Sequence, residues 1–441
     1  MLNFKNIRLF NIKKIEFFLI WIMMLLPFYN NFFYTVDSQH QFDVFMEGTQ
    51  SLVWARIANS DQNGIFSDGL LMGRCYPVSK ECEGNNSLCA KRYQKEIYIK
   101  KHKIDRYDLY KSHSAFHTLL FTSINKIFNF NPKTMVNLFK FLTALINAFI
   151  FTVLITMIFS RYGIFITLFI TLFLILNFWF ICYGNELYMF FGFMFIPLII
   201  SWKVFESYSD KNNLSYTKMY FFITLAILFK CLLTGFEFIS CSVLMVFVPI
   251  VFFSIERKWK ITRFLFNNIL ASISIILGVV IAMVILCFQI SFVDVNVGIE
   301  HMLSRFIERT AGAGVDLANE IAPERLELFT VLKLYLTTTA INTFRFIHTL
   351  FWQLLFFHIL ACVILLSFRK YKALIVASLV AFLASVSWLI LFRQHAAVHT
   401  HLDPIIWYMP YLFFAFALVG LAVKEVGLII IKKTKNLSVL T

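Results

Sequence analysis

The chain is poor in charged residues. Only 15% of its 441 residues are Asp, Glu, Lys or Arg, whereas soluble domains carry about 25%. Apolar residues make up 59%, and apolar runs of about 18 residues or more recur with almost no charge. One water-soluble core cannot hold so many apolar side chains. The composition therefore excludes a soluble enzyme, a nucleic-acid-binding domain and a disordered chain.

The short motifs of several well-known enzyme classes are also missing. The sequence contains no Gly-rich phosphate loop, no Ser–His–Asp order of a hydrolase and no zinc-protease motif. No small-residue cleavage site follows the first apolar run, so we interpret that run as a retained membrane anchor. Functional residues must therefore be sought among the scattered polar positions of a membrane protein.

Ten apolar segments are predicted to span a membrane as helices. They cover residues 15–33, 135–158, 163–182, 187–205, 219–235, 238–255, 266–290, 346–367, 373–392 and 405–423. The segments predict an all-α polytopic membrane protein that forms a single integral membrane domain over residues 1–441. A large first extracytoplasmic loop at 34–134 and a second large one at 291–345 complete this topology.

The basic residues predict how the chain is oriented. The N-terminus, four short connections, the C-terminal tail and the adjoining span ends hold 19 of the 40 Lys and Arg residues but only five acidic ones. Because Lys and Arg collect in short cytoplasmic segments, both termini are expected in the cytoplasm and both long loops outside. The net charge of +15 thus reflects membrane orientation and requires no nucleic-acid partner.

Six charged residues lie at or near the outer ends of the predicted spans. They are Lys140, Glu186, Lys230, Glu237, Arg393 and Asp403. A charge at the bilayer centre costs about 2.5–3.5 kcal/mol, so charges within spans commonly line water or a site. Snorkelling to the headgroups is the alternative, and it is the preferred explanation for Lys140. Since all six lie on one side, we expect the outer face to carry the function.

The first outer loop begins with acidic residues. Asp37 sits where the chain leaves the membrane, and Asp43 and Glu47 are four residues apart, so they share a helix face. An ordinary polar exit from the span explains Asp37 equally well. Residues 115–130 are apolar on one face and predict a helix that lies on the membrane surface.

Three cysteines recur every seven residues in the same loop: Cys75, Cys82 and Cys89. In an oxidising compartment two of them could pair and leave one thiol over. A metal site is the weaker alternative because no His falls at ligand spacing. We expect a structural disulfide whose pairing the sequence does not determine.

The next two outer turns are short and acidic. Gly184 and Asn185 supply a hairpin turn that does not need a carboxylate, so Glu186 is a candidate site residue. The following turn carries Lys230 and Glu237, which could simply neutralise each other. Together with Asp37, these acidic turns predict convergence on one pocket.

The last outer turn gathers basic and aromatic residues: Arg393, His395, His399, His401 and Trp407. Arg and His supply donors and positive charge, so phosphate recognition is the preferred interpretation. In an extended chain the rings of His399 and His401 would point to one side, which leaves a metal site completed by Asp403 as an alternative. A polar cap on the hairpin is a third.

Together these features resemble the GT-C glycosyltransferases, polytopic enzymes that use polyprenyl-phosphate-linked sugars. The similarity rests on Asp37 just after the first span, on a large first outer loop with a surface helix, and on Glu186 in the second outer turn. The local pattern is similar to that of uncharacterised bacterial membrane proteins from surface-polysaccharide gene clusters. It comprises Lys230-Cys231-Leu232-Leu233-Thr234-Gly235-Phe236-Glu237-Phe238, His399-Thr400-His401 and Trp407-Tyr408-Met409-Pro410.

The resemblance implies an inverting hexosyl or pentosyl transfer from a polyprenyl-phosphate donor to a glycan, lipid or protein acceptor. The site would face the outside of the bacterial inner membrane. Asp37 and Glu186 would be catalytic, with Asp37 as the general base for the acceptor hydroxyl, a role typically worth about 10²–10⁴-fold. Substrate binding would fall to Asp43, Lys230, Glu237, Arg393, His395, His399, His401 and Trp407.

The resemblance also bears on cofactors. Some members of the superfamily hold a divalent cation, such as Mg²⁺ or Mn²⁺, between carboxylates of the first loop and the second turn. Here Asp37 and Glu186 would be those ligands, although the doubled acidic motif is absent at Asp37. No other cofactor is expected.

Two other functional classes fit parts of the pattern. A polysaccharide polymerase or ligase also has many spans and Arg/His-rich outer loops, but it tends to place its large catalytic loop late in the chain. A lipid-linked sugar flippase or transporter predicts internal repeats and charges near the bilayer midplane. In this sequence no repeat is found, and the large loop follows the first span.

Overall fold

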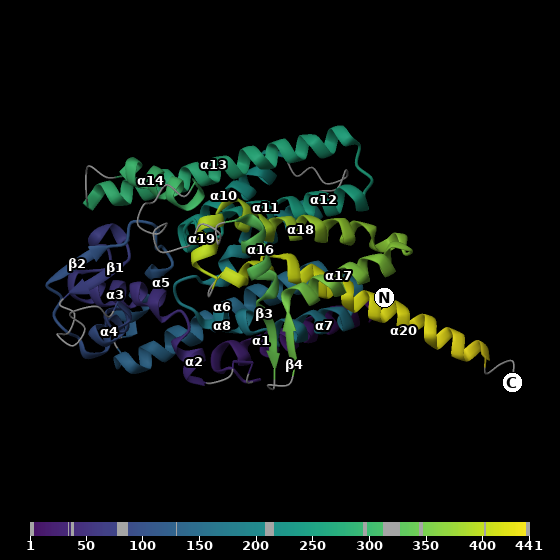
Figure 1. Ribbon diagram of the computed structural model, residues 1–441, viewed down its shortest axis with the longest axis horizontal. Helices are drawn as coiled ribbons and strands as arrows, with labels where there is room; N and C mark the ends of the chain where they lie inside the picture. Colours follow the sequence, from purple (N-terminus) through teal and green to yellow (C-terminus); the bar gives the residue numbers. More distant parts are fainter. Residues whose placement is uncertain are drawn as a thin grey trace.

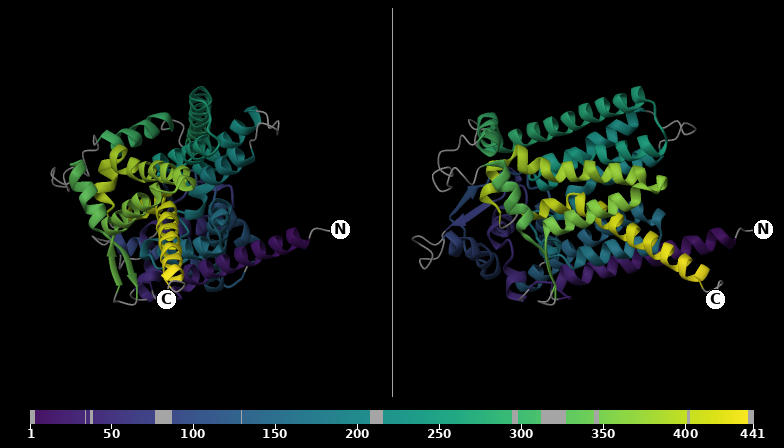
Figure 2. Two further views of the ribbon diagram at one scale, coloured as in Figure 1. Left: turned by 90° about the vertical axis from the view of Figure 1, so that its right-hand side faces the viewer. Right: turned by 45° about the vertical axis from the view of Figure 1, so that its right-hand side comes forward.

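The computed structural model describes residues 4–33, 35–36, 39–76, 87–128, 130–207, 216–293, 298–311, 327–343, 347–400 and 403–437. The protein is mostly helical, as the sequence predicts, and long helices run side by side through most of its length (Figure 1). The N- and C-termini lie at the same end of this bundle (Figures 1 and 2). An even number of membrane crossings requires that arrangement.

Within the described residues, six helical segments are long and apolar enough to cross a membrane. They are Pro132–Tyr162 (α6 and η3), Tyr216–Thr234 (α10), Ile239–Glu256 (α11 and α12), Ile261–Val293 (α13), Arg369–Leu391 (η7 and α18) and Tyr411–Thr434 within α20 (Tyr411–Leu437). Shorter apolar helices are α7 (Ile164–Ile175), α16 (Leu328–Thr337) and α17 (Phe351–Leu366). Helix α1 (Phe4–Asn30) covers most of the first predicted span. The membrane class is thus supported, while the number of ten spans stays a prediction.

Two of the predicted spans are interrupted. Within 163–182, α7 ends at Ile175 and the short α8 (Phe178–Cys182) begins after Asn177. Within 187–205, the α-helix starts only with α9 (Ile196–Ser207), after the 3₁₀ turn η5 (Phe191–Phe195). The side chain of Asn147 in α6 donates to the carbonyl of Gly184 at 2.8 Å and accepts from the amide of Gly192 at 2.8 Å. A polar side chain from a neighbouring helix therefore satisfies backbone groups that a continuous helix would have paired.

The first outer loop folds into a compact unit at the end of the bundle opposite the termini (Figure 1). Its elements are α2 (Gln39–Val44), α3 (Glu47–Asn63), η1 (Ser67–Leu70), β1 (Gly73–Tyr76), α4 (Ser87–Lys100), β2 (Arg106–Leu109) and α5 (Thr118–Phe128). Strands β1 and β2 pair antiparallel, and α3 packs against α4, α5 and β1. Helix α5 falls inside the predicted surface helix 115–130, and Ile127 and Phe128 at its end are exposed.

The remaining short elements lie in the chain segments that connect the helices of the bundle. They are η4 (Tyr183–Asn185), α14 (Gly298–Ala311), α19 (Arg393–Val398), η8 (Asp403–Tyr408), and an antiparallel hairpin of β3 (Thr339–Thr343) and β4 (Ile347–Leu350). Two small two-stranded sheets, β1–β2 and β3–β4, contain the strands of the described residues. They add short β-structure to a fold that the sequence predicts as all-α.

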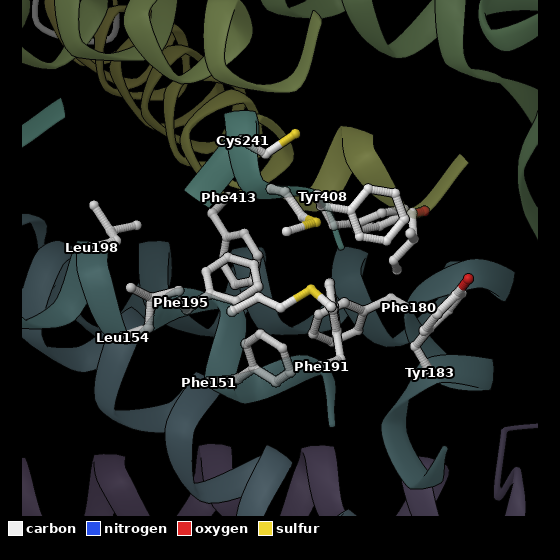
Figure 3. Close-up of a cluster of buried hydrophobic side chains, with 14 of the residues drawn as sticks. Phe151, Leu154, Phe180, Tyr183, Phe191, Phe195, Leu198, Cys241, Tyr408 and Phe413 are labelled. Atoms are coloured by element: carbon white, nitrogen blue, oxygen red, sulfur yellow. The ribbon is translucent and has the colours of Figure 1, made fainter. Parts of the chain in front are cut away.

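Aromatic side chains from separate helices fill the core beneath the outer end. The ring centroid of Phe151 in α6 lies 4.8 Å from that of Phe180, 5.3 Å from that of Phe191 and 5.8 Å from that of Phe413. Figure 3 shows these rings directed towards one another from α6, α8, η5 and α20. Tyr183 lies at the edge of this cluster, so the packed core holds the turn that carries Glu186 in a fixed position.

Candidate functional site

Most of the site residues predicted from the sequence lie towards the outer end of the bundle, but two lie outside the described residues. These two are Asp37 and His401. Their predicted roles, as general base and as phosphate or metal ligand, stay predictions.

Glu186 organises the turn between α8 and η5. Its side chain is buried, and its two carboxylate oxygens accept hydrogen bonds from the amides of Tyr188, at 3.0 Å, and Met189, at 2.5 Å. Burial raises the pKa of Glu186 to about 7, although the two amides and the positive charge of Lys140 partly oppose this rise. The turn is thus built around a carboxylate that titrates near neutral pH.

Lys140 connects this turn to the first outer loop. Its ammonium donates to the backbone carbonyl of Asp43 at 3.3 Å and lies 3.9 Å from the Asp43 carboxylate. It is also near enough to interact electrostatically with Glu47 and Glu186. Lys140 therefore interacts with three carboxylates, those of Asp43 and Glu47 in the first outer loop and that of Glu186 in the turn.

Lys230 is buried inside the next turn and binds backbone there. Its ammonium donates to the carbonyls of Gly235, at 2.9 Å, and Glu237, at 2.6 Å. These bonds fold residues 235–237 back over the end of α10. They hold the turn in shape, which the sequence alone did not predict, and the predicted substrate contact of Lys230 stays a prediction.

His113 packs against the same turn. Gly235 has a positive φ of 60°, and a Cβ atom placed there would lie 2.7 Å from Cδ2 of His113. Glycine is needed here both for the left-handed backbone and for the close approach of the imidazole. The hydroxyl of Ser114 adds hydrogen bonds to the carbonyls of Cys231 and Leu232, at 3.1 and 2.8 Å. The first outer loop is thereby fixed to the end of α10.

His113 and His117 were not among the predicted site residues. The ring of His113 lies 5.3 Å from that of His117 and 5.4 Å from that of Tyr188, so the pair sits between two outer turns. Burial lowers the pKa of His117 to about 4, even though the nearby backbone of Leu233 favours the charged form. Only the spacing of the two histidines before α5 could have signalled them in the sequence.

Lys140 and the three carboxylates near it form the first polar cluster of the site. Glu237 and the last outer turn form a second one. The Glu237 carboxylate lies 4.0 Å from Nε2 of His395, and the His395 ring lies 4.3 Å from the ring of His399. Asp403 is buried and accepts a hydrogen bond from the indole of Trp388 at 3.0 Å. The Trp388 ring lies 5.4 Å from the His395 ring, so acidic groups from the turn before α11 and from η8 lie near the imidazoles of α19 and of the residue that ends it. Among the described residues, no three ligand-type side chains are arranged to hold a metal ion.

Tyr183 links the two clusters. Burial raises the pKa of its hydroxyl well above the usual value, and the negative charges of Asp403, Glu186 and Glu237 raise it further. Three of the six unexplained charges are therefore near enough to influence one phenol. The convergence of Glu186 and Glu237 with Asp37 on one pocket stays a prediction.

Arg393 and Trp407 occupy very different surroundings. Arg393 begins α19, is exposed, and makes no ion pair with any described residue. Trp407 is buried, donates to the carbonyl of Tyr335 at 3.2 Å, and packs against Phe351 and Phe382. Arg393 is thus available to an anion, whereas Trp407 supports the fold, and its predicted substrate contact stays a prediction.

An apolar cavity of about 610 Å³ opens beside the second cluster. It lies between α11, α13 and α18, with Met302 of α14 and Phe392 among its lining residues. Ile276 and Leu391 also line it and are 62% and 54% exposed, so it is open to the side of the bundle. Phe236 and Phe392 bring its wall to the residues that directly precede Glu237 and Arg393.

Of the three cysteines of the first loop, Cys75 has a described side chain. Cys75 is buried, takes part in no disulfide and donates to the carbonyl of Ala55 at 3.4 Å. Burial raises the pKa of the Cys75 thiol to about 12. Cys82 and the side chain of Cys89 lie outside the described part of the chain, so a disulfide between those two stays a prediction.

Comparison with known proteins yields no relative. No protein-family model matches the chain, and no match is found among curated proteins or solved structures. The function must therefore be argued from the residues of the site themselves.

Proposed function

We propose that the protein is a membrane glycosyltransferase of the bacterial inner membrane. In this proposal it transfers a sugar from a polyprenyl-phosphate-linked donor to a glycan, lipid or protein acceptor on the outer face. The resemblance to GT-C enzymes motivates the proposal, and the geometry at the outer end of the bundle supports it.

One observation carries the proposal most directly. The apolar cavity between α13 and α18 is open to the side of the bundle, and its wall ends at Phe392, next to Arg393. A polyprenyl chain needs an apolar channel reached from the bilayer, while its phosphate needs a cation that no protein carboxylate already occupies. In this proposal the cavity supplies the apolar channel, and the exposed Arg393, which directly follows the lining residue Phe392, supplies the cation.

The proposed reaction is a single displacement. The acceptor hydroxyl oxygen attacks the anomeric carbon while the bond from that carbon to the phosphate oxygen breaks. The hydroxyl proton passes to the carboxylate of Asp37, and the configuration at the anomeric carbon inverts. Polyprenyl phosphate leaves with the bonding electrons. Arg393 and the imidazoles of His395 and His399 stabilise the negative charge that grows on it.

Glu186 acts in this proposal as a positioning residue. Both of its oxygens are held by backbone amides, and the side chain is buried. It fixes the turn on which Tyr188 stands and fixes the charge that faces Lys140. Lys230 plays a similar part in the neighbouring turn through its bonds to backbone carbonyls.

The residues described around Glu186 do not fit a divalent cation. Each of its carboxylate oxygens already accepts a backbone hydrogen bond, and among the described residues no group of three ligand-type side chains is present to supply the oxygen ligands that a hard cation such as Mg²⁺ takes. The proposed mechanism therefore has no step that passes through a metal.

Binding of undecaprenyl phosphate to the full-length protein in nanodiscs tests the donor site. Replacing Arg393 by Ala should weaken binding about tenfold or more, because a charge-assisted contact to phosphate is lost. Arg369→Ala, an exposed arginine at the opposite end of the bundle, is the matched control. Equal affinity for undecaprenol, which lacks the phosphate, would contradict the proposed role of Arg393.

Transfer itself is tested in membranes that contain lipid-linked sugars. Asp37→Ala should abolish the formation of new glycosidic product while the protein is still expressed at the normal level. Full activity in that variant would remove Asp37 from the mechanism. Movement of the lipid-linked sugar across a bilayer without any new glycosidic bond would instead favour a flippase, and chain-length growth of a repeat-unit glycan would favour a polymerase or ligase.

A further inference from the structure

A second cavity lies in the first outer loop, away from the apolar cavity and the two polar clusters. It has a volume of about 430 Å³ and is formed between α3, α4 and the segment that follows α4. Ala58, Ile97 and Tyr98 make its buried floor, and Asp61, Gln62, Lys101 and Lys103 stand around it. Helices α3 and α4 lie at the end of the molecule opposite the termini (Figure 1), which is the end that the sequence predicts to lie outside the membrane.

The cavity carries two uncompensated positive charges. Asp61 is already engaged, since its carboxylate accepts from the Asn125 amide at 2.9 Å and lies 3.7 Å from the Lys126 ammonium. Lys101 and Lys103 form no ion pair with any residue in the described ranges. The neighbouring Lys100, in contrast, is paired with Glu96 at 2.8 Å. The electrostatics of the cavity therefore favour an anion.

The segment that carries both lysines is held in place. The side chain of Gln62 donates to the carbonyl of His102 at 2.7 Å and accepts from the amide of Ile104 at 3.1 Å. The His102 ring also stacks on Tyr93 with the centroids 5.9 Å apart. These contacts fix the backbone on both sides of Lys103, so the ammonium groups are presented from an ordered backbone.

Lys101 occupies a position that favours glycine. Its φ is 54°, and the amides of Lys101 and His102 bond back to the carbonyls of Tyr98 and Ile97 at 3.4 and 3.1 Å. This is the helix-ending pattern in which the left-handed residue is usually Gly, because a Cβ atom is unfavourable there. A lysine at such a position is strained, and strained residues cluster at functional sites.

We propose that this cavity binds a carboxylate-bearing sugar unit of an acceptor glycan. The inference rests on the proposed glycosyltransferase function and names the chemistry of its acceptor. Two ammonium groups match a sugar carboxylate, and the volume is far larger than a simple anion needs. The buried apolar floor suits the C–H face of a sugar ring.

The distance from this cavity to the first polar cluster, around Lys140, agrees with an acceptor glycan in an extended conformation. Helix α3 carries Glu47, beside Lys140, at one end and Asp61, at the cavity, near the other. Asp61 follows Glu47 by fourteen positions along the helix, which corresponds to about 21 Å at 1.5 Å per position. A glycan of several sugar units would reach from the cavity to the outer ends of the spans.

Calorimetric binding of tetragalacturonate to the full-length protein in nanodiscs tests the inference. The double variant Lys101→Gln/Lys103→Gln should bind about tenfold more weakly or worse, because hydrogen bonds between charged groups are lost. Lys100→Gln is the matched control and should bind like the wild type. Lys101→Arg/Lys103→Arg should retain binding, and added salt should weaken it.

Three results would overturn the inference. They are unchanged affinity of the double glutamine variant, equal binding of the neutral sugar maltotetraose, and displacement of tetragalacturonate by inorganic phosphate at similar concentration. The experiments distinguish failure of the cavity inference from failure of the proposed function. If transfer occurs but the double variant keeps its acceptor KM, the cavity inference fails alone. If tetragalacturonate binding depends on the lysines but no transfer is detected, the cavity stands and the proposed function fails.

Discussion

The carboxylate of Glu237 lies 4.0 Å from Nε2 of His395, although the two residues belong to different outer turns. Both side chains are largely buried, with Glu237 at 8% and His395 at 17% side-chain exposure. An acid and an imidazole at this distance influence each other's charge, since screening by water is reduced at a buried position. This contact joins the turn after α10 to α19, and Phe236 of that turn also lines the apolar cavity.

The Glu237–His395 pair should act as a unit. Glu237→Gln and His395→Gln are each expected to lower the rate of sugar transfer by about 10²-fold, because a charge beside the leaving phosphate is lost or misplaced. The double variant should be little worse than either single one, as is typical of coupled residues. Transfer rates of the wild type, the two single variants and the double variant, measured in membranes, form a double-mutant cycle. If the fold-losses of the single variants multiply in the double variant, the two side chains act independently.

Gly235 should not tolerate a side chain. Gly235→Ala is expected to cost about 1–2 kcal/mol for the left-handed backbone and about 1–3 kcal/mol for the clash with His113. The thermal stability of the purified protein measures this loss. Gly427→Ala is the control, because no atom lies within 4 Å of a Cβ there and a helical alanine is neutral or stabilising. Equal stability of the two variants would mean that His113 does not approach the turn.

Glu186 should make stability depend on pH. Its pKa is about 7 in the folded protein against 4.5 for an ordinary Glu. The folded state therefore favours the protonated carboxyl. The corresponding stability is complete below about pH 4.5, falls as the pH rises through 7, and stays lost above it. Melting temperatures measured between pH 4.5 and 8 should show this fall in the wild type.

Two variants separate Glu186 from other titrating groups. Glu186→Gln stays neutral at every pH, so the fall in melting temperature between pH 4.5 and 8 should be smaller than in the wild type. Glu300→Gln, at an exposed position in α14, should leave the wild-type profile intact. A profile that is the same in all three proteins would show that the Glu186 carboxyl does not titrate in this range.

Cys75 should be unreactive in the native protein. Its thiol is buried, and the raised pKa of about 12 leaves almost no thiolate at pH 8. A maleimide reagent should label it only after denaturation, and mass spectrometry of the peptide reads this out without prior reduction. Labelling that requires a reductant even after denaturation would show that Cys75 is held in a disulfide.

Local sequence signals and tertiary contacts were predicted unequally well. The apolar runs located most helices, but hydropathy does not reveal the break at Asn177, or that Asn147 of the continuous helix α6 pairs with the irregular backbone at Gly184 and Gly192. Lys230 was noticed because it is charged, yet its bonds to two backbone carbonyls depend on how the turn folds back. Trp407 was linked to the site by its position next to the last turn, but it is buried against aromatic rings.

The sequence by itself determined that this is a helical membrane protein with its unexplained charges at one end, because hydropathy and charge bias are properties of consecutive residues. Only the tertiary structure decided that Glu186, Glu237 and Asp403 all lie near enough to Tyr183 to raise the pKa of its hydroxyl, and that an apolar cavity is lined by Phe392, the residue before Arg393. These relationships join segments far apart in the chain. They arise because packing of α6, α10, α13, α18 and α20 brings the outer turns to one place, which no local pattern encodes.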